Sequence, residues 1–310
     1  MKDVLGTLYL LWPAIVLALI LLTVVSIILG GFFIIFVLIG YYCFQWLKKK
    51  GVFDLFVSWI RINEKLIGDE LQLHLQKTFL LRGNIAFHDH QSTTLYIAHP
   101  HGLFSMAPFL HWAAEVTEWP ENTRKIHIAV HSIFFKIPFV KELMESYGAI
   151  EATEAEIRRV LQTGDSVALL TGGIEELNKT ESGKMNIVLK KRKGFLRIAR
   201  DLEIPIVPVL TFGENELFPP IRGYWIEKCQ DYLKKWFGIA LPIPTYQSLE
   251  NWFSLLKGPL EQKVVTWVGK PVVTSKKESL DGIREKTLEA ILELYKEGRP
   301  KHYPSTIDVC

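Results

Sequence analysis

One stretch of the sequence limits what the whole chain can form: residues 8–47 contain no charged side chain. These forty residues are enough for two crossings of a bilayer, at about 20 residues per helix. Gly30 and Gly31 lie near the middle of the run, where the chain would have to reverse. A secretory signal peptide has a much shorter apolar region and a small-residue cleavage pattern, and neither is found here. We therefore predict a membrane hairpin over residues 1–50, either transmembrane or re-entrant.

The charges that flank this run predict the orientation of the hairpin. Lys48, Lys49 and Lys50 close the run, and positively charged flanks tend to stay on the cytosolic side of a membrane. We expect both ends of the hairpin in the cytosol; one long tilted helix is the alternative, and a buried core helix is the third interpretation. Residues 51–73 carry apolar side chains at helical spacing, which fits a helix lying in the membrane interface or packing on the following domain.

Residues 51–310 have the length of one large domain. The net charge of the chain is +3 and the charges are spread along it, so we expect no nucleic-acid partner. The three cysteines, Cys43, Cys229 and Cys310, form no Cys-x-x-Cys pair. This argues against a disulfide scaffold and fits a domain that faces a reducing compartment.

Strand-like and helical patterns alternate along this domain. Strands are expected at residues 95–98, 126–129, 166–170, 206–211 and 266–273, and helices at residues 139–147, 152–163, 195–202 and 279–297. The alternation predicts an α/β fold with a mostly parallel mixed sheet and flanking helices. Residues 222–257 interrupt it with eight aromatic side chains among lysines, which suits a membrane interface, an acyl-chain groove or ordinary core.

Two histidines end the strand predicted over residues 95–98. His99 and His101 are separated by Pro100 and followed by Gly102, so the strand breaks abruptly and presents imidazole at its end. A neutral imidazole can take a proton from an alcohol near neutral pH, because the ordinary pKa of His is about 6.5. This motif is therefore a candidate general base.

Other interpretations of these histidines are a structural pair at a strand end or a metal site that includes His88 and His90. Zinc requires three or four convergent ligands, and no Cys pair or His-Glu-x-x-His helix supplies the remainder. We therefore predict no metal. The sequence also has no Gly-x-Ser-x-Gly elbow, no Walker loop and no Rossmann glycine fingerprint.

A second motif follows the strand predicted over residues 166–170. Gly172 and Gly173 allow the backbone to pass close to another group. Glu176 comes three residues later, and a carboxylate can orient a histidine or stabilise its imidazolium. A solvated acidic loop is the other interpretation.

A third motif is the basic run at residues 190–193, which opens the helix predicted over residues 195–202. A helix N-terminus attracts anions, and a basic cluster there is typical of a phosphate site. A charged surface segment is the alternative.

Together these motifs resemble the type-2 diacylglycerol acyltransferase family, which includes monoacylglycerol and wax-alcohol acyltransferases. The His-Pro-His-Gly, Gly-Gly-x-x-Glu and Arg-Lys-Gly-Phe segments occur in the order and spacing of that family. Residues 135–138, 208–218 and 268–271 also match family segments. The resemblance runs from the N-terminal hairpin to near the C-terminus, and it implies a fold of the glycerolipid acyltransferase type.

The resemblance implies roles for individual residues. It makes His101 the general base, His99 a required neighbour, and Glu176 the family's glutamate. It places the CoA phosphates on Arg192 and Lys193. The remaining substrate-binding residues that it implies are Pro100, Gly102, Gly172, Gly173, Gly194, Phe195, Glu214 and Asn215.

The chain departs from the broader superfamily at one position. That superfamily has an Asp five residues after its histidine, whereas this chain has Met106. Glu176 is therefore the carboxylate to consider for the role of that Asp.

The implied activity is acyl-CoA-dependent O-acyl transfer to a glycerolipid hydroxyl, converting diacylglycerol to triacylglycerol or acting on monoacylglycerol. The transfer would be direct, with acyl-CoA as co-substrate and no cofactor. The expected partners are acyl-CoA, a neutral glycerolipid and a bilayer, with a homo-oligomer left open. The expected location is the endoplasmic reticulum membrane, with the domain facing the cytosol, and lipid droplets. The alternatives are a wax-alcohol or lysophospholipid acyltransferase, or a non-catalytic membrane protein that binds lipid.

Overall fold

A computed structural model describes residues 39–43, 45, 46, 49, 68–83, 92–113, 124–137, 140–238 and 243–310. Most of the predicted hairpin over residues 1–50, and most of the predicted helix over residues 51–73, lie outside these residues. Within the described parts of the chain, no helix is both long and apolar enough to cross a membrane. The chain divides into two compact units, residues 1–73 with 133–147, and residues 74–132 with 148–310.

The smaller unit is helical in its described parts. Residues 39–43 are helical, as is α6 (Val140–Ser146), and the side-chain amide of Gln45 donates a hydrogen bond to Glu142 over 2.6 Å. Helix α4 (Gly68–Thr78) and the 3₁₀ helix η3 (Ser132–Phe135) each belong partly to this unit and partly to the larger one.

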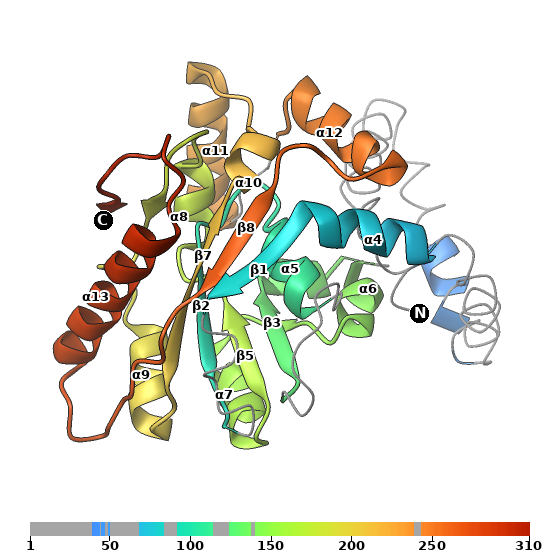
Figure 1. Ribbon diagram of the computed structural model, residues 1–310. Helices are drawn as coiled ribbons and strands as arrows, with labels where there is room; N and C mark the ends of the chain where they lie inside the picture. Colours follow the sequence, from blue (N-terminus) through green and yellow to red (C-terminus); the bar gives the residue numbers. More distant parts are fainter. Residues whose placement is uncertain are drawn as a thin grey trace. The chain divides into compact units, whose positions relative to one another are not determined.

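The larger unit is built on a seven-stranded sheet in the order β1-β8-β7-β2-β5-β3-β4 (Figure 1). All neighbouring strands in it are parallel except β7 and β8, which are antiparallel. The strands are β1 (Phe79–Gly83), β2 (Leu95–His99), β3 (Ile126–Val130), β4 (Ile150–Glu151), β5 (Ser166–Leu169), β7 (Ile206–Phe212) and β8 (Val264–Val268). A separate two-stranded sheet pairs β6 (Asn186–Ile187) with β9 (Asp308–Val309). The predicted α/β fold with a mostly parallel mixed sheet is confirmed.

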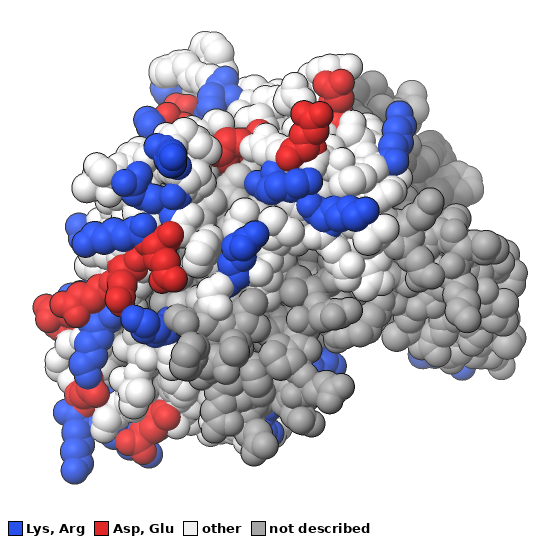
Figure 2. Space-filling view, in the orientation of Figure 1, with Lys and Arg blue, Asp and Glu red and all other residues white. Residues whose placement is uncertain are grey.

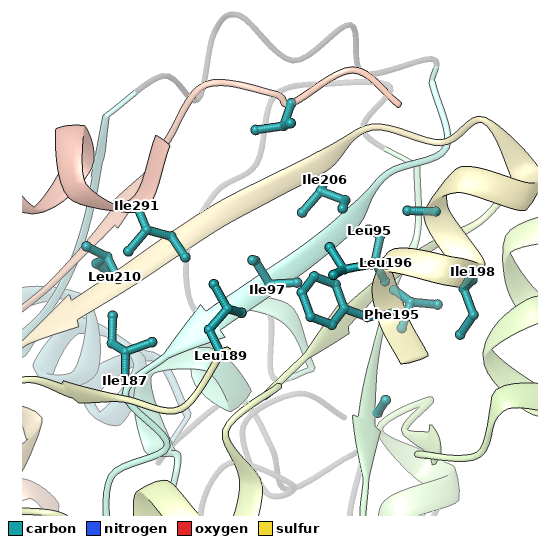
Figure 3. Close-up of a cluster of buried hydrophobic side chains, with 14 of the residues drawn as sticks. Leu95, Ile97, Ile187, Leu189, Phe195, Leu196, Ile198, Ile206, Leu210 and Ile291 are labelled. Atoms are coloured by element: carbon teal, nitrogen blue, oxygen red, sulfur yellow. The ribbon is translucent and has the colours of Figure 1, made fainter. Parts of the chain in front are cut away.

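Helices cover both faces of the large sheet, because its central strands are apolar on both sides. Leu95 and Ile97 of β2 face one way, into a core closed by α7 (Glu154–Gln162), α9 (Gly194–Leu202) and α13 (Leu280–Gly298) (Figures 1 and 3). Tyr96 and Ala98 face the other way, into a core that includes Trp112 of α5 (Met106–Trp112). Burial of each large apolar side chain contributes roughly 1.5–3 kcal/mol, so the alternation along β2 fixes which side of the sheet each residue takes.

The strand order explains why the three sequence motifs meet. Strand β2 lies between β5 and β7 and is parallel to both. The two-histidine turn follows β2, the glycine pair follows β5, and the segment with Glu214 follows β7. Since parallel neighbours end at the same edge of a sheet, the three segments converge there. Ligands of open α/β sheets bind at this edge.

The remaining helices lie around this edge (Figure 1). They are α8 (Gly173–Asn178), α10 (Glu214–Leu217), α11 (Tyr224–Phe237) and α12 (Tyr246–Lys257). The predicted break over residues 222–257 therefore contains two helices, α11 and α12. The sequence patterns did not reveal the strands β1, β4, β6 and β9.

Candidate active site

His99, the last residue of β2, is fully buried and both of its ring nitrogens are occupied. Its Nδ1 lies 2.6 Å from Oε1 of Glu176, and its Nε2 lies 2.9 Å from the hydroxyl oxygen of Thr171. A carboxylate accepts hydrogen bonds, so Nδ1 is the donor to Glu176, and in the neutral ring Nε2 accepts from the threonine hydroxyl. His99 therefore has no ring nitrogen left for a substrate.

Glu176 accepts hydrogen bonds from three donors in two separate segments. Besides the ring of His99, its carboxylate accepts the backbone N–H of His101 at 2.8 Å and that of Val188 at 2.8 Å. The side chain is completely buried, and hydrogen bonds to a buried carboxylate are stronger than neutral ones. Glu176 thus joins the turn after β2 to the turn after β5.

Gly172 makes room for this carboxylate. A Cβ atom at position 172 would lie 1.8 Å from Cδ and 2.2 Å from Cγ of Glu176. No side chain fits at that distance, so the chain needs a glycine here for close approach rather than for a special φ angle.

His101 lies in the same turn, after a cis His99–Pro100 peptide bond, but its environment differs from that of His99. The residue is partly exposed. Its Nδ1 lies 3.0 Å from the carbonyl oxygen of Gly102 and 3.1 Å from Oγ of Ser105, which itself donates to the carbonyl of His101 over 2.8 Å. Because the Gly102 carbonyl can only accept, Nδ1 carries the proton. Nε2 then holds the lone pair, and among the described residues it has no hydrogen-bond partner.

Burial of this ring favours its neutral form. Burial lowers the pKa of His101 below its ordinary value, although the Gly102 carbonyl and the charge of Glu176 act in the opposite direction. A neutral imidazole with a free Nε2 lone pair can accept a proton near neutral pH.

Glu214 holds the segment that follows the histidine turn. Its carboxylate accepts the backbone N–H groups of Met106 and Ala107, at 2.7 and 3.0 Å, and so caps the start of α5. Burial raises the pKa of Glu214 to about 7, even though these two hydrogen bonds lower it. The predicted substrate-binding residue Glu214 is therefore placed where it positions the histidine turn.

Asn215 is equally buried. Its amide nitrogen donates to the carbonyls of Glu181 and Lys184, at 3.4 and 3.2 Å. Its Oδ1 has no hydrogen-bond partner among the described residues. A Cβ added to Gly102, which has a φ of +65°, would lie 3.6 Å from this oxygen and 3.0 Å from Oε1 of Glu214.

The basic motif lies beside the glycine pair. A terminal nitrogen of Arg192 donates to the carbonyl of Gly172 over 3.0 Å and lies 3.6 Å from the carboxylate of Glu175. Lys193 is exposed and directly precedes α9, whereas Phe195 is buried in the core behind that helix (Figure 3). The structure therefore brings Arg192 to the glycine pair and places Phe195 away from it.

Three contributors to the site were missed by the sequence reasoning: Ser105, Thr171 and Val188. The position of Thr171 between a predicted strand and a glycine pair could have indicated a site residue. Nothing in the sequence distinguishes Ser105 or Val188 from other residues of their type. Thr171, His99 and Glu176 are hydrogen-bonded in series, as are the nucleophile, histidine and carboxylate of serine hydrolases. Thr171 is only 8% exposed and His99 is 0% exposed, so a substrate has little access to either side chain. The role of this network is therefore to hold the turn together.

The described residues contain no group of three or more His, Cys, Asp or Glu side chains that could hold a metal ion. His88 and His90, considered above as metal ligands, lie outside the residues that the structure describes.

Comparisons with known proteins agree with the resemblance. The model of the family "Diacylglycerol acyltransferase" matches residues 18–308. The chain is 32% identical to "Diacylglycerol O-acyltransferase 2" of Dictyostelium discoideum, over 71% of this chain and 69% of that protein. It is 27% identical to "2-acylglycerol O-acyltransferase 1" of Bos taurus, over 76% and 71% of the two chains. It is 29% identical to "Acyl-CoA wax alcohol acyltransferase 1" of Homo sapiens, over 66% of each.

Proposed function

Because the chain belongs to the diacylglycerol acyltransferase family, we propose that the histidine turn after β2 transfers an acyl group from acyl-CoA to a glycerolipid hydroxyl. The protein is an acyl-CoA-dependent acylglycerol O-acyltransferase. Within that activity we propose diacylglycerol as the preferred acceptor, with triacylglycerol as the product. Monoacylglycerol and long-chain alcohols are the acceptors of other relatives and the main competitors.

One observation supports His101 as the base: its Nε2 is the unoccupied ring nitrogen of the turn, whereas both nitrogens of His99 are bonded. In this mechanism Nε2 removes the proton of the acceptor hydroxyl while the hydroxyl oxygen attacks the thioester carbonyl. The C–S bond then breaks, and the proton on Nε2 passes to the sulfur of the departing CoA. The transfer is direct, without an acyl-enzyme.

The oxyanion formed during attack requires hydrogen-bond donors. The backbone N–H of His101 is taken by Glu176, and that of Gly173 donates to the carbonyl of Leu170 over 3.2 Å. This leaves the N–H groups of Gly102 and Gly172 as the donors that we propose. Gly102 lies in the histidine turn and Gly172 packs against Glu176, and both residues are buried.

For the CoA phosphates we propose Arg192 and Lys193. Replacing Lys193 with Gln should raise the KM for acyl-CoA about tenfold with little change in kcat, because a charged hydrogen bond contributes roughly 1.5–3 kcal/mol. Replacing Arg192 with Gln should also lower kcat, since its guanidinium holds the Gly172 carbonyl. Initial rates at varied acyl-CoA concentrations measure the KM and kcat of both variants. Lys277→Gln, an exposed lysine before α13, is the control, and an unchanged KM in Lys193→Gln would contradict the phosphate site.

The acceptor is tested with microsomes that contain this chain, radiolabelled oleoyl-CoA and a panel of acceptors. We expect label in triacylglycerol when diacylglycerol is supplied. Label in wax ester, or in phosphatidate from lysophosphatidate, would select one of the alternative acceptors. No labelled product with any acceptor would leave the lipid-binding alternative and overturn the enzymatic assignment.

We propose the endoplasmic reticulum membrane as the site of action, with the catalytic domain toward the cytosol, and extend the proposal to lipid droplets. The charge-free run at residues 8–47 supports a membrane anchor. Asn178 and Thr180 form a glycosylation sequon at the end of α8. Glycosylation of Asn178 in cells would place the catalytic loop in the lumen and overturn this orientation.

A further inference from the structure

Helix α11 carries a stripe of aromatic side chains that the fold leaves uncovered. Trp225, Tyr232 and Trp236 are 79%, 58% and 65% exposed, and Cys229 between them is also exposed. These four residues are spaced at i, i+4, i+7 and i+11, which places them on one face of the helix. On the neighbouring face Gln230 is buried and Leu233 is half-buried. We call Trp225, Cys229, Tyr232 and Trp236 the aromatic stripe.

Lysines border this stripe. The ammonium of Lys228 lies 4.9 Å from the centre of the Tyr224 ring, and that of Lys235 lies 5.7 Å from the ring of Trp236. In Figure 2 the tip of the larger unit where Figure 1 places α11 is uncharged, with both basic and acidic side chains close beside it. Trp and Tyr with adjacent Lys are the residues enriched where proteins meet the membrane–water interface.

A second exposed apolar face lies on α12, at the same end of the sheet (Figure 1). Tyr246 and Phe253 are 81% and 53% exposed, and Leu249 between them is partly exposed. The segments that lead into the two helices are hydrogen-bonded to each other. The backbone N–H of Ile221, before α11, donates to the carbonyl of Ile243, before α12. Large exposed apolar patches of this kind mark interaction sites rather than ordinary surface.

Helix α11 is also tied to the candidate active site. The ammonium of Lys234 lies 3.4 Å from the carboxylate of Glu175, which follows Gly173 and precedes Glu176 in α8. Arg192 approaches the same carboxylate at 3.6 Å. The helix that presents the aromatic stripe is therefore attached to the segment that organises the histidine turn.

From these observations we infer that the aromatic stripe of α11 docks on the surface of the bilayer that holds the acceptor lipid. The helix lies in the plane of the interface, with the rings at headgroup depth and Lys228 and Lys235 on anionic headgroups. A second copy of the chain is the less suitable occupant, since lysine is depleted in protein–protein interfaces. The inference rests on the proposed function, because docking brings the histidine turn to a lipid substrate.

The direct test places a fluorophore on Cys229 of the full-length chain with Cys43 and Cys310 changed to Ser. The protein is reconstituted in vesicles of phosphatidylcholine and phosphatidylserine that carry nitroxide-labelled headgroups. We expect a blue-shifted emission and strong quenching by the nitroxide. The control is the same fluorophore at Glu289→Cys, on the exposed face of α13, with Cys229 also changed to Ser; it should stay unquenched. A water-like emission at Cys229 would overturn the proposal, as would disulfide-linked Cys229 dimers of the same variant left unlabelled in vesicles.

A kinetic test uses the triple variant Trp225→Ser, Tyr232→Ser and Trp236→Ser. The apparent KM for diacylglycerol in vesicles should rise about tenfold or more, whereas the rate on a short-chain acceptor dispersed in water should not change. Val273→Ser, an exposed apolar residue elsewhere, should change neither. Equal losses of activity on both acceptors would show that the aromatic stripe stabilises the fold and does not dock on the bilayer. Docking can fail while acyl transfer persists, and transfer can fail while Cys229 remains quenched, so the two proposals are tested separately.

Discussion

Replacing His101 with Asn is expected to lower kcat for acyl transfer by about 10²–10⁴-fold, the usual contribution of a general base. The Asn amide nitrogen falls near the position of Nδ1 and can still donate to the carbonyl of Gly102, so the turn keeps its hydrogen bond. The variant lacks Nε2, the atom that takes the proton. Steady-state rates with acyl-CoA and diacylglycerol measure the loss, and an unchanged thermal midpoint shows that the fold is intact.

The pH profile connects this loss to the titration of His101. Since its pKa lies below the ordinary 6.5, the neutral, active form persists as the pH falls through 6.5. We expect kcat/KM to stay level there and to decline only at lower pH. The kcat/KM profile could also change near pH 7, because burial raises the pKa of Glu214 to about 7. A change there that disappears in Glu214→Gln would report the titration of Glu214. A near-normal rate for purified His101→Asn would remove His101 from the mechanism.

His99 provides the contrast. Its buried ring links Glu176 to Thr171, so His99→Gln should lower both the thermal midpoint and kcat, because it loosens the turn. The acid limb of the remaining activity should keep the position set by His101. A positioning residue and a base are distinguished in this way, although both changes reduce turnover.

Much of the fold could be predicted because its signals are local. The apolar runs that became β2, β5 and β7 are short and bounded by Gly, Pro or charged residues, and the helices between them have clear amphipathic spacing. Strand order is not local. That β2 lies between β5 and β7 follows from packing across the whole sheet, so the sequence motifs indicated a shared function without showing how they meet. The strand β8 was expected, but its antiparallel pairing with β7 was equally hidden, since its residues resemble those of the parallel strands.

The partners of the site residues were less predictable than the residues. Sequence reasoning considered Glu176 as the carboxylate for His101, whereas its carboxylate binds the ring of His99 and only the backbone of His101. A spacing of two residues does not reveal which ring points inward, because that depends on backbone angles in a turn that contains Pro100 and Gly102. Phe195 shows the same limit: its place in a family motif is clear, but its burial in the core depends on which face α9 turns to the sheet.

The second large effect is expected at Gly172. In Gly172→Ala the new Cβ would lie 1.8 Å from Cδ of Glu176, so the carboxylate must leave its site. The His99 ring and the N–H groups of His101 and Val188 then lose their acceptor, at roughly 1–3 kcal/mol for each buried group left unpaired. Several kcal/mol is a large part of a typical folding free energy of about 5–15 kcal/mol. We expect the thermal midpoint to fall by about 10 °C and acyl transfer to be nearly abolished.

The neighbouring glycine is the matched control for this prediction. Gly173 has a φ of +53°, but a Cβ there meets no atom within 4 Å. Gly173→Ala should therefore cost only the backbone penalty, roughly 1–2 kcal/mol, and retain most activity. Adding Glu176→Gln to Gly172→Ala should lower stability little further, since the carboxylate has already been displaced and the two changes share one set of contacts. Additive losses in that double variant, or a normal thermal midpoint in Gly172→Ala, would mean that the carboxylate is not the group that holds the histidine turn in place.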